Sequence, residues 1–188
     1  PADTGRYRIS FAPDAGGKTN PGIDADIVIV TTGGNPKRGG YSMLDGLDLE
    51  IIDPLPSLFS FNIGSPDCID NPALQTRDKD LSALMGTVVN GAVAGLAGTK
   101  FRAEGPLLVT DWGMSGPAIL KLSSYAARYL AENQYKSRLV VNWLGEMNVN
   151  DVLSMLADFA SRSPQKQLSS IYPERFNSRL WSFLLGRA

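Results

Sequence analysis

Two glycine-containing segments hold the residues best suited to chemistry. In the first, Thr32, Gly33 and Gly34 follow an apolar β-branched run at residues 27–30. Glycines at the carboxyl end of a parallel strand let a ligand approach the main chain closely, and ligands collect at that edge of α/β sheets. A tight turn without any ligand explains two glycines after a strand equally well.

The second segment, residues 105–117, carries a strand into a glycine-bracketed turn and then into a helix. We expect Ser115 to cap this helix and Pro117 to occupy its first turn. The amides and dipole of a helix start favour an anion or an electron-rich ligand edge, and Gly113 and Gly116 would leave room for it. A well-capped corner with no ligand is the more frequent alternative.

Several other kinds of catalytic or metal site are excluded by residue type. The chain has no histidine and one cysteine, Cys68, so Ser-His-Asp catalysis, His-ligated zinc, intrachain disulfides and cysteine-held iron–sulfur clusters are ruled out. Residues 16–19 read Gly-Gly-Lys-Thr, like the end of a phosphate-binding loop. However, Ala12 stands where that motif needs glycine, and Asn-Pro-Gly follows in place of a helix.

Composition indicates a globular protein with almost balanced charge. The 188 residues are 43% hydrophobic and 20% charged, with a net charge of −1. That charge predicts neither nucleic-acid nor membrane binding. No apolar run is long enough to span a bilayer, and residues 1–20 lack the features of a signal peptide, so we expect a cytoplasmic location.

Hydrophobic periodicity predicts many short strands followed by helices. Expected strands lie at residues 7–12, 27–30, 58–63, 87–93, 99–103, 107–110 and 139–144, with a short helix at 41–47 and a loop at 67–80. Three further helices are expected from Pro117, after Asn148 and from Pro173. Strands spaced about ten residues apart predict an antiparallel barrel or small sandwich. The run at 27–30 predicts partner strands elsewhere, because one parallel strand cannot form a sheet.

Each of these helices carries an apolar stripe along one face, and the three tryptophans are expected to lie in the core. The stripe residues are Ile119, Leu122, Ala126, Tyr129 and Leu130 in the first helix, Val149, Val152, Leu153, Leu156 and Phe159 in the second, and Phe176, Leu180, Phe183 and Leu184 in the third. The tryptophans are Trp112, Trp143 and Trp181.

Three segments together resemble one family. Residues 27–37 with Gly40 and Tyr41, residues 56–63 and residues 105–122 are similar, in order and spacing, to the bacterial BaiN/YhiN-like flavoproteins, FAD-dependent oxidoreductases of the NAD(P)/FAD type. The resemblance covers roughly residues 26–181. It implies a dinucleotide-binding FAD domain, a β-barrel-like domain inserted in it, and a small helical domain. Asp111 departs from the histidine more usual in the family, so we carry over no proton-transfer role.

On this resemblance we expect an α+β chain in three parts. Residues 1–53 would be a remnant of an α/β FAD-binding domain, 54–145 an antiparallel β-barrel-like insert with one helix, and 146–188 a helical subdomain. The Gly-x-Gly-x-x-Gly turn that opens such FAD domains is missing from the sequence, so we expect an interior piece of the flavoprotein. Its expected partners are the flanking FAD-binding domain of the same protein and a small-molecule substrate.

The function expected by resemblance is to cover the flavin and shape the substrate cleft, without catalysis by this portion alone. FAD is the cofactor expected in the intact protein, with NAD(P) as a second. The expected cofactor-lining residues are Thr32, Gly33, Gly34, Gly113, Ser115, Gly116 and Pro117. The alternative is a non-catalytic protein-interaction or ligand-binding module. A self-sufficient hydrolase is disfavoured because the chain lacks histidine and paired acids.

Overall fold

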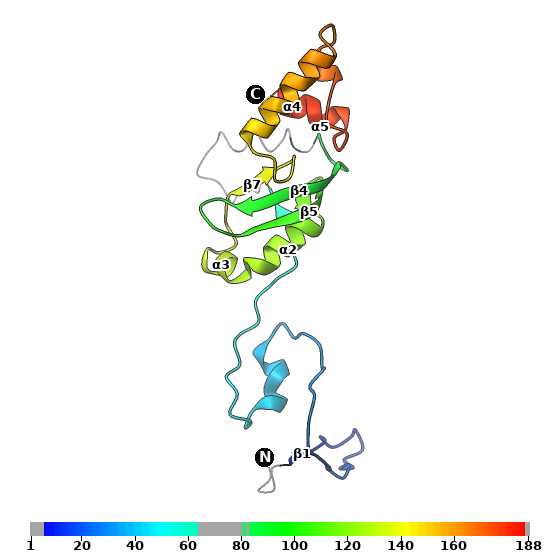
Figure 1. Ribbon diagram of the computed structural model, residues 1–188. Coiled ribbons are helices and arrows are strands. Elements are labelled where there is room, and N and C mark those ends of the chain that lie inside the picture. The colour runs from blue at the N-terminus through cyan, green and yellow to red at the C-terminus, as the bar shows by residue number, and fades with distance from the viewer. Residues whose placement is uncertain (1–5, 64–80, 82, 187–188) are drawn as a thin grey trace. The chain divides into compact units, whose positions relative to one another are not determined.

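The computed structural model describes residues 6–63, 81 and 83–186 (Figure 1). Contacts divide the chain into two units, Pro1–Pro54 and Leu55–Ala188, and each is described by itself. The loop expected at 67–80, which includes Cys68, lies outside the described residues. The three-part division expected from the sequence stays a prediction.

The first unit contains one small hairpin and one short helix. Strand β1 (Tyr7–Ile9) pairs antiparallel with β2 (Ile23–Ala25). Two exposed ion pairs connect the two sides of this hairpin. Arg8 pairs with Asp24 at 3.0 Å, and Arg6 pairs with Asp26 at 2.8 Å. The 3-10 helix η1 (Arg38–Leu44) begins a few residues before the helix expected at 41–47. The strand expected at 7–12 forms only over its first three residues.

The strand expected at residues 27–30 does not form in this chain. These residues have no regular secondary structure, and Ile27 and Ile29 are 79% and 81% exposed. An extended segment buries its side chains only when neighbouring strands satisfy its main-chain hydrogen bonds. No described strand pairs with this run, so the expectation of a buried strand here was wrong.

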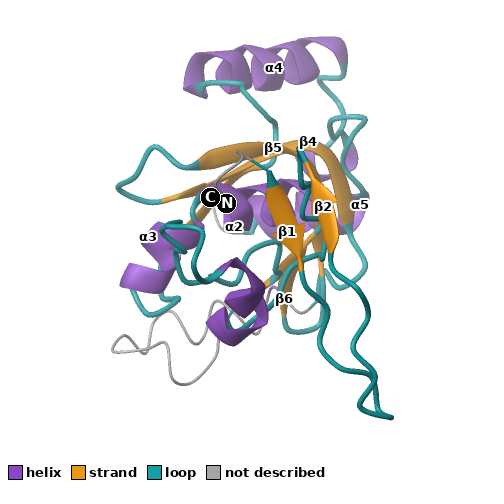
Figure 2. Cartoon of the chain, turned by 90° about the horizontal axis from the view of Figure 1, so that it is seen from below, coloured by secondary structure: helices purple, strands orange, loops and turns teal. Residues whose placement is uncertain are grey.

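The second unit is built on a curled antiparallel sheet (Figure 2). Its strand order is β3-β6-β5-β4-β7, and every pairing is antiparallel. The strands are β3 (Phe61–Asn62), β4 (Val88–Leu96), β5 (Arg102–Val109), β6 (Gly113–Ser115) and β7 (Leu139–Asn142). The expected α+β class with a barrel-like sheet is confirmed at this coarse level, as a half-barrel.

Strand β5 is continuous where the sequence predicted two strands. Pro106 lies inside it, although proline has no N–H to donate to a neighbouring strand. The pairing register of β4 shifts between Val89 and Ala92, opposite this proline. Gly91 takes a positive φ of 67° within that bulge. The break that Gly-Pro suggested is therefore absent, and the irregularity of the pairing lies in β4.

The helical elements whose bounds the structure describes in the second unit follow or interrupt the strands. They are α2 (Pro117–Tyr125), α3 (Ala127–Glu132), α4 (Val149–Arg162), the 3-10 helix η3 (Leu168–Ser170) and α5 (Ser178–Leu185). The helix starts expected at Pro117 and after Asn148 are confirmed, and Asn148 forms a capping box with Asp151. The third helix begins later than expected, at Ser178, because Asn177 supplies its cap by accepting from the Leu180 N–H.

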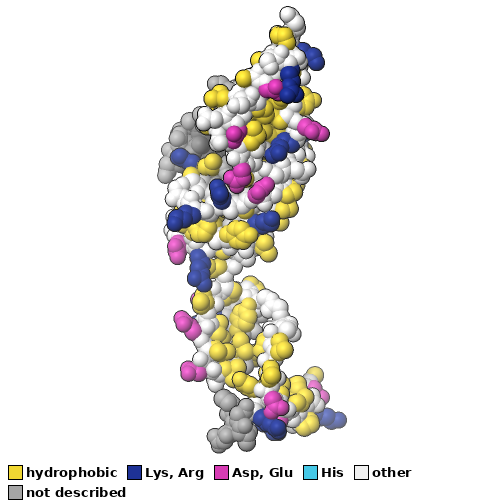
Figure 3. All heavy atoms as spheres, viewed as in Figure 1, with side chains coloured by type: hydrophobic (Ala, Val, Ile, Leu, Met, Phe, Trp, Pro, Cys, Tyr) yellow, Lys and Arg dark blue, Asp and Glu magenta, His cyan; other side chains and the backbone are white. Residues whose placement is uncertain are grey.

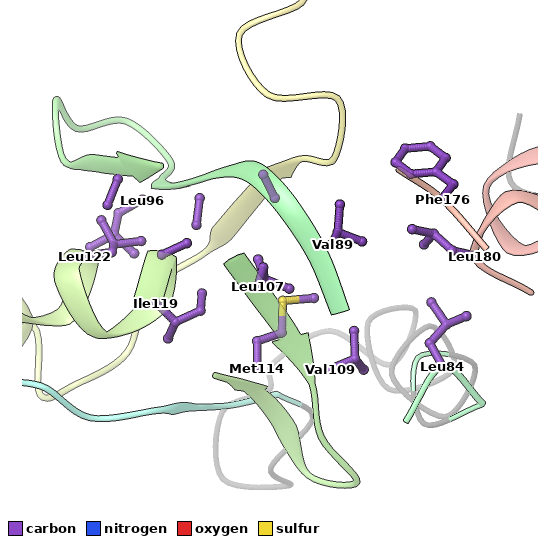
Figure 4. Close-up of a cluster of buried hydrophobic side chains, with 14 of the residues drawn as sticks. Leu84, Val89, Leu96, Leu107, Val109, Met114, Ile119, Leu122, Phe176 and Leu180 are labelled. Carbon is purple, nitrogen blue, oxygen red and sulfur yellow. The ribbon is translucent and has the colours of Figure 1, made fainter. Parts of the chain in front are cut away.

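One face of the sheet packs against α2, and its far end packs against α5 (Figure 4). The core residues include Val89, Leu107, Val109, Ile119, Leu122 and Leu180, all fully buried. One expectation about the core was wrong, because Trp112 is 47% exposed. No residue of α4 is fully buried, with Val149 and Leu153 at 74% and 58% exposed, but Leu156 is partly buried against the core.

Among the described residues, no helix combines the length and apolarity that crossing a bilayer requires. The same residues contain no group of three His, Cys, Asp or Glu side chains placed to hold a metal ion.

A matched pair of leucines tests this core. Leu122→Ala should lower the free energy of unfolding by about 2–5 kcal/mol, because a fully buried side chain leaves a cavity. Leu153→Ala on α4 should cost less than about 1 kcal/mol, because its side chain is mainly in water. Urea unfolding followed by circular dichroism measures both, and equal losses would contradict the packing described here.

Candidate functional site

The loop at Thr32, Gly33 and Gly34 is open to a ligand. All three residues are exposed, and Gly33 adopts a positive φ of 76°, which side chains other than glycine rarely take. A Cβ built on Gly33 or on Gly34 meets no heavy atom within 4 Å. The space that these glycines leave is therefore not used by the described chain itself.

The residues after this loop hold it in one shape. The Asn35 N–H donates to the Tyr41 hydroxyl at 2.9 Å, and that hydroxyl donates to the Asn35 carbonyl at 3.3 Å. The Lys37 N–H also donates to Asn35 Oδ1, at 3.1 Å. Gly40 lies so close to the Asn35 side chain that a Cβ would overlap it. The glycine loop is thus attached to a locally bonded turn.

The second predicted segment is a hairpin followed by a helix, where the sequence predicted a single strand-to-helix turn. Between β5 and β6, the Thr110 N–H donates to the Gly113 carbonyl and the Gly113 N–H donates to Thr110 Oγ1, both at 2.9 Å. Asp111 and Trp112 form the exposed tip. The Ile63 N–H donates to the Trp112 carbonyl at 3.0 Å, which fixes the tip beside β3.

Ser115 does not cap α2, contrary to the expectation. Gly116 is the N-cap residue, with a φ of 92° and no side-chain cap bond. The Ser115 hydroxyl instead lies 2.6 Å from the Ser60 hydroxyl. Another serine, Ser123 on α2, accepts from the Phe59 N–H at 3.0 Å. The two serines therefore hold residues 59 and 60 against the end of β6 and the last turn of α2.

Gly113 and Gly116 are needed by the packing of the chain itself. A Cβ on Gly113 would overlap the Phe61 carbonyl oxygen of β3, and one on Gly116 would lie 2.7 Å from the Pro106 carbonyl oxygen. Pro117 is exposed at the first position of α2. We expected space for a ligand beside these glycines, but backbone atoms of the chain itself occupy it. A cofactor-lining role for this segment stays a prediction.

None of the predicted site residues lines either of two shallow depressions. One, of about 640 Å³, is in the first unit and is lined by Arg38, residues 44–46 and residues 48–51. The other, of about 540 Å³, lies in the second unit at the end of the β4–β5 hairpin. None of the residues that line the second depression was predicted from the sequence as part of a site. The excess of Lys and Arg over Asp and Glu in residues 71–188 is a sequence signal that points to this part of the chain.

The two sets of glycines should respond differently to substitution. Gly113→Ala should lower the free energy of unfolding by about 1–3 kcal/mol, because β3 must move away from β6. Gly34→Ala should change it by less than about 0.5 kcal/mol, because its surroundings are empty. Urea unfolding of the two variants measures this difference, and a larger loss at Gly34 would refute the assignment.

Comparisons with known proteins place this chain. A family model described as "HI0933-like protein barrel and H2TH domain" matches residues 71–188. A ribosomal RNA dihydrouridine synthase of Escherichia coli (strain K12) is 28% identical over 121 residues, which are 61% of this chain and 26% of the relative. The protein of that name from Haemophilus influenzae (strain ATCC 51907 / DSM 11121 / KW20 / Rd) is 32% identical over 104 residues, 52% of this chain and 23% of the relative.

The match therefore spans about a quarter of the length of each relative. HI0933-like domains belong to FAD-dependent oxidoreductase-like proteins, in agreement with the coarse family expected from the sequence. Because the family model covers more than half of the residues, the chain belongs to the HI0933-like family, of which it carries the barrel and H2TH domain.

Proposed function

We propose that this chain is the barrel and H2TH portion of a flavin-dependent enzyme that reduces uridine in ribosomal RNA. The observation that carries the proposal is that both matched relatives bear the name ribosomal RNA dihydrouridine synthase. In this proposal the portion covers the flavin and shapes the cleft that receives the RNA base, and it has no catalysis of its own. NAD(P) is the proposed source of electrons.

The chemistry of such a reaction divides clearly between cofactor and protein. Dihydrouridine differs from uridine by a hydride and a proton added across the C5–C6 double bond of the base. A bound flavin supplies hydride transfer. The part of this chain that best fits a cofactor edge is the loop of Gly33 and Gly34, whose surroundings are empty. The segment from Gly113 to Pro117 would act mainly by holding β3, β6 and α2 together beside the cleft.

A nucleic-acid substrate replaces the small molecule expected from the sequence. The net charge of −1 conceals an uneven distribution, because residues 71–188 carry thirteen Lys and Arg against nine Asp and Glu, and residues 1–70 carry five against ten. Figure 3 shows Lys and Arg side chains distributed over the surface of the second unit. A cationic portion is suited to meeting an anionic RNA. The expectation that no nucleic acid binds was based on the average charge alone.

The exposed run at residues 27–30 supports a flanking FAD-binding domain as partner. All four of its side chains are apolar and exposed, and in an extended conformation they would face two opposite sides. A strand that is apolar on both sides is typical of a parallel sheet covered by helices on both faces. Added to such a sheet, the run would bring Thr32, Gly33 and Gly34 to a carboxyl edge, where ligands bind.

Flavin content tests the cofactor part of this proposal. The 188-residue chain purified alone should be colourless, whereas the product of the complete gene should carry flavin, measured by absorbance and fluorescence. In the complete protein, Gly34→Leu should reduce bound flavin by more than about tenfold, because a side chain would fill the ligand space. Gly34→Ala, with one added carbon, should reduce it less. A chain of 188 residues that retains flavin would refute the proposal.

The substrate part is tested in the organism that carries the gene. Deleting the gene should remove dihydrouridine from ribosomal RNA, measured by mass spectrometry of digested nucleosides, and a plasmid copy should restore it. Complementation with the Gly34→Leu gene should fail if the loop borders the flavin. Ribosomal RNA with unchanged dihydrouridine after the deletion would overturn the proposed substrate.

A further inference from the structure

The depression at the end of the β4–β5 hairpin has an apolar floor and cationic side chains around it. We name it the basic groove, defined by Val93, residues 95–102, Val140 and Asn142, with Arg138 beside it. We infer that the basic groove binds the phosphate backbone of RNA. This inference rests on the proposed function, since it identifies where the RNA substrate contacts the second unit.

The topology of the sheet brings three cations from three segments to this one end. Lys100 lies in the turn between β4 and β5, and Arg102 begins β5. Arg138 directly precedes β7, and its carbonyl accepts from the Ala97 N–H at 2.9 Å, which fixes it beside the same turn. All three cationic residues are exposed. Arg138 is far from Lys100 and Arg102 in the sequence, and the antiparallel pairing of β7 with β4 brings it beside them.

The groove is preformed. Thr99 holds its turn, because the Thr99 hydroxyl donates to the Leu96 carbonyl at 2.8 Å and accepts from the Phe101 N–H at 3.1 Å. Gly95 leaves the floor open between Val93 and Val140, which is 53% exposed. A preformed backbone lowers the ordering cost of binding.

The groove is on the sheet face that the core helices leave open. Along β4, the groove residues Val93 and Gly95 alternate with Ala94 and Leu96, which are buried toward α2. Figure 2 shows α2 on the other side of β4 and β5. Packing of the described core therefore does not cover the floor of the groove.

An RNA backbone matches the groove better than another class of partner. Phosphates pair with Lys and Arg, and the apolar floor can receive the sugar or base between them. Two acidic side chains lie close to these cations, because Glu146 is 3.6 Å from Arg102 and the exposed Glu104 pairs across the sheet with Val93. Both side chains of the Arg102–Glu146 ion pair are more than 60% exposed, so the pair is weak and a phosphate can replace the carboxylate.

Charge reversal in the groove tests the inference. The probe is a fluorescein-labelled single-stranded RNA of about 20 nucleotides, and fluorescence anisotropy at about 50 mM and about 200 mM salt gives its affinity for the purified chain. Lys100→Glu, Arg102→Glu and Arg138→Glu together should weaken binding more than about tenfold and reduce the slope of log affinity against log salt by about two. Glu146→Gln should strengthen binding about twofold, because it releases Arg102.

The matched control reverses three exposed cations elsewhere in the same unit, Lys121, Arg128 and Lys166. This control has the same net charge as the groove variant and should bind within about threefold of the unchanged chain. Thermal melting by circular dichroism confirms that both variants fold. Equal losses in the two variants, no loss in the groove variant, or no RNA binding by the unchanged chain would each overturn the inference.

The experiments distinguish a wrong assignment of the groove from a wrong proposed function. If gene deletion removes dihydrouridine but the groove variant restores it fully, the enzyme acts on ribosomal RNA and the groove is not its contact. If the groove variant instead loses an acidic protein partner while its RNA affinity is unchanged, the groove is a protein-binding surface and the inference is wrong.

Discussion

Strand β5 must be hydrogen-bonded on both edges and covered on one face, and the second unit is arranged around that requirement. β4 and β6 complete its main-chain hydrogen bonds. The start of α2 lies directly on it, with Gly116 so close to the Pro106 carbonyl that no side chain fits. This close approach brings Ile119 and Leu122 onto Leu107 and gives the fully buried centre of the core. The close approach of the two backbones at Gly116 is therefore part of how α2 packs on the sheet.

The run at residues 27–30 has neither hydrogen-bonded neighbouring strands nor a covering layer in the described chain. Its side chains are as apolar as those of β5, yet they are exposed, because no described strand lies beside them. Exposed apolar surface costs about 25 cal/mol for each Å² that a partner could cover. The proposed flanking FAD-binding domain would supply both the hydrogen bonds and the cover that this run lacks.

Local patterns predicted the parts of the fold that depend on local physics. The 3.6-residue period identified the buried face of α2, and an asparagine identified the start of α4. Contacts between distant segments were not predictable. The bulge in β4, opposite Pro106 of β5, is one example. The candidate site shows the same limit, because a glycine with open surroundings and one pressed against the chain's own backbone look alike in sequence. A Cβ on Gly34 meets no heavy atom within 4 Å, whereas one on Gly116 would lie 2.7 Å from the Pro106 carbonyl oxygen.

Amide hydrogen exchange, measured on the 188-residue chain and on the complete gene product, tests most directly whether the exposed run is completed by a partner sheet. The account predicts slow exchange for the amides of β5 in both proteins, because its partners are within the second unit. It predicts fast exchange at residues 27–30 in the 188-residue chain and slow exchange in the complete product. Fast exchange at these residues in both proteins, or slow exchange in the chain alone, would contradict it.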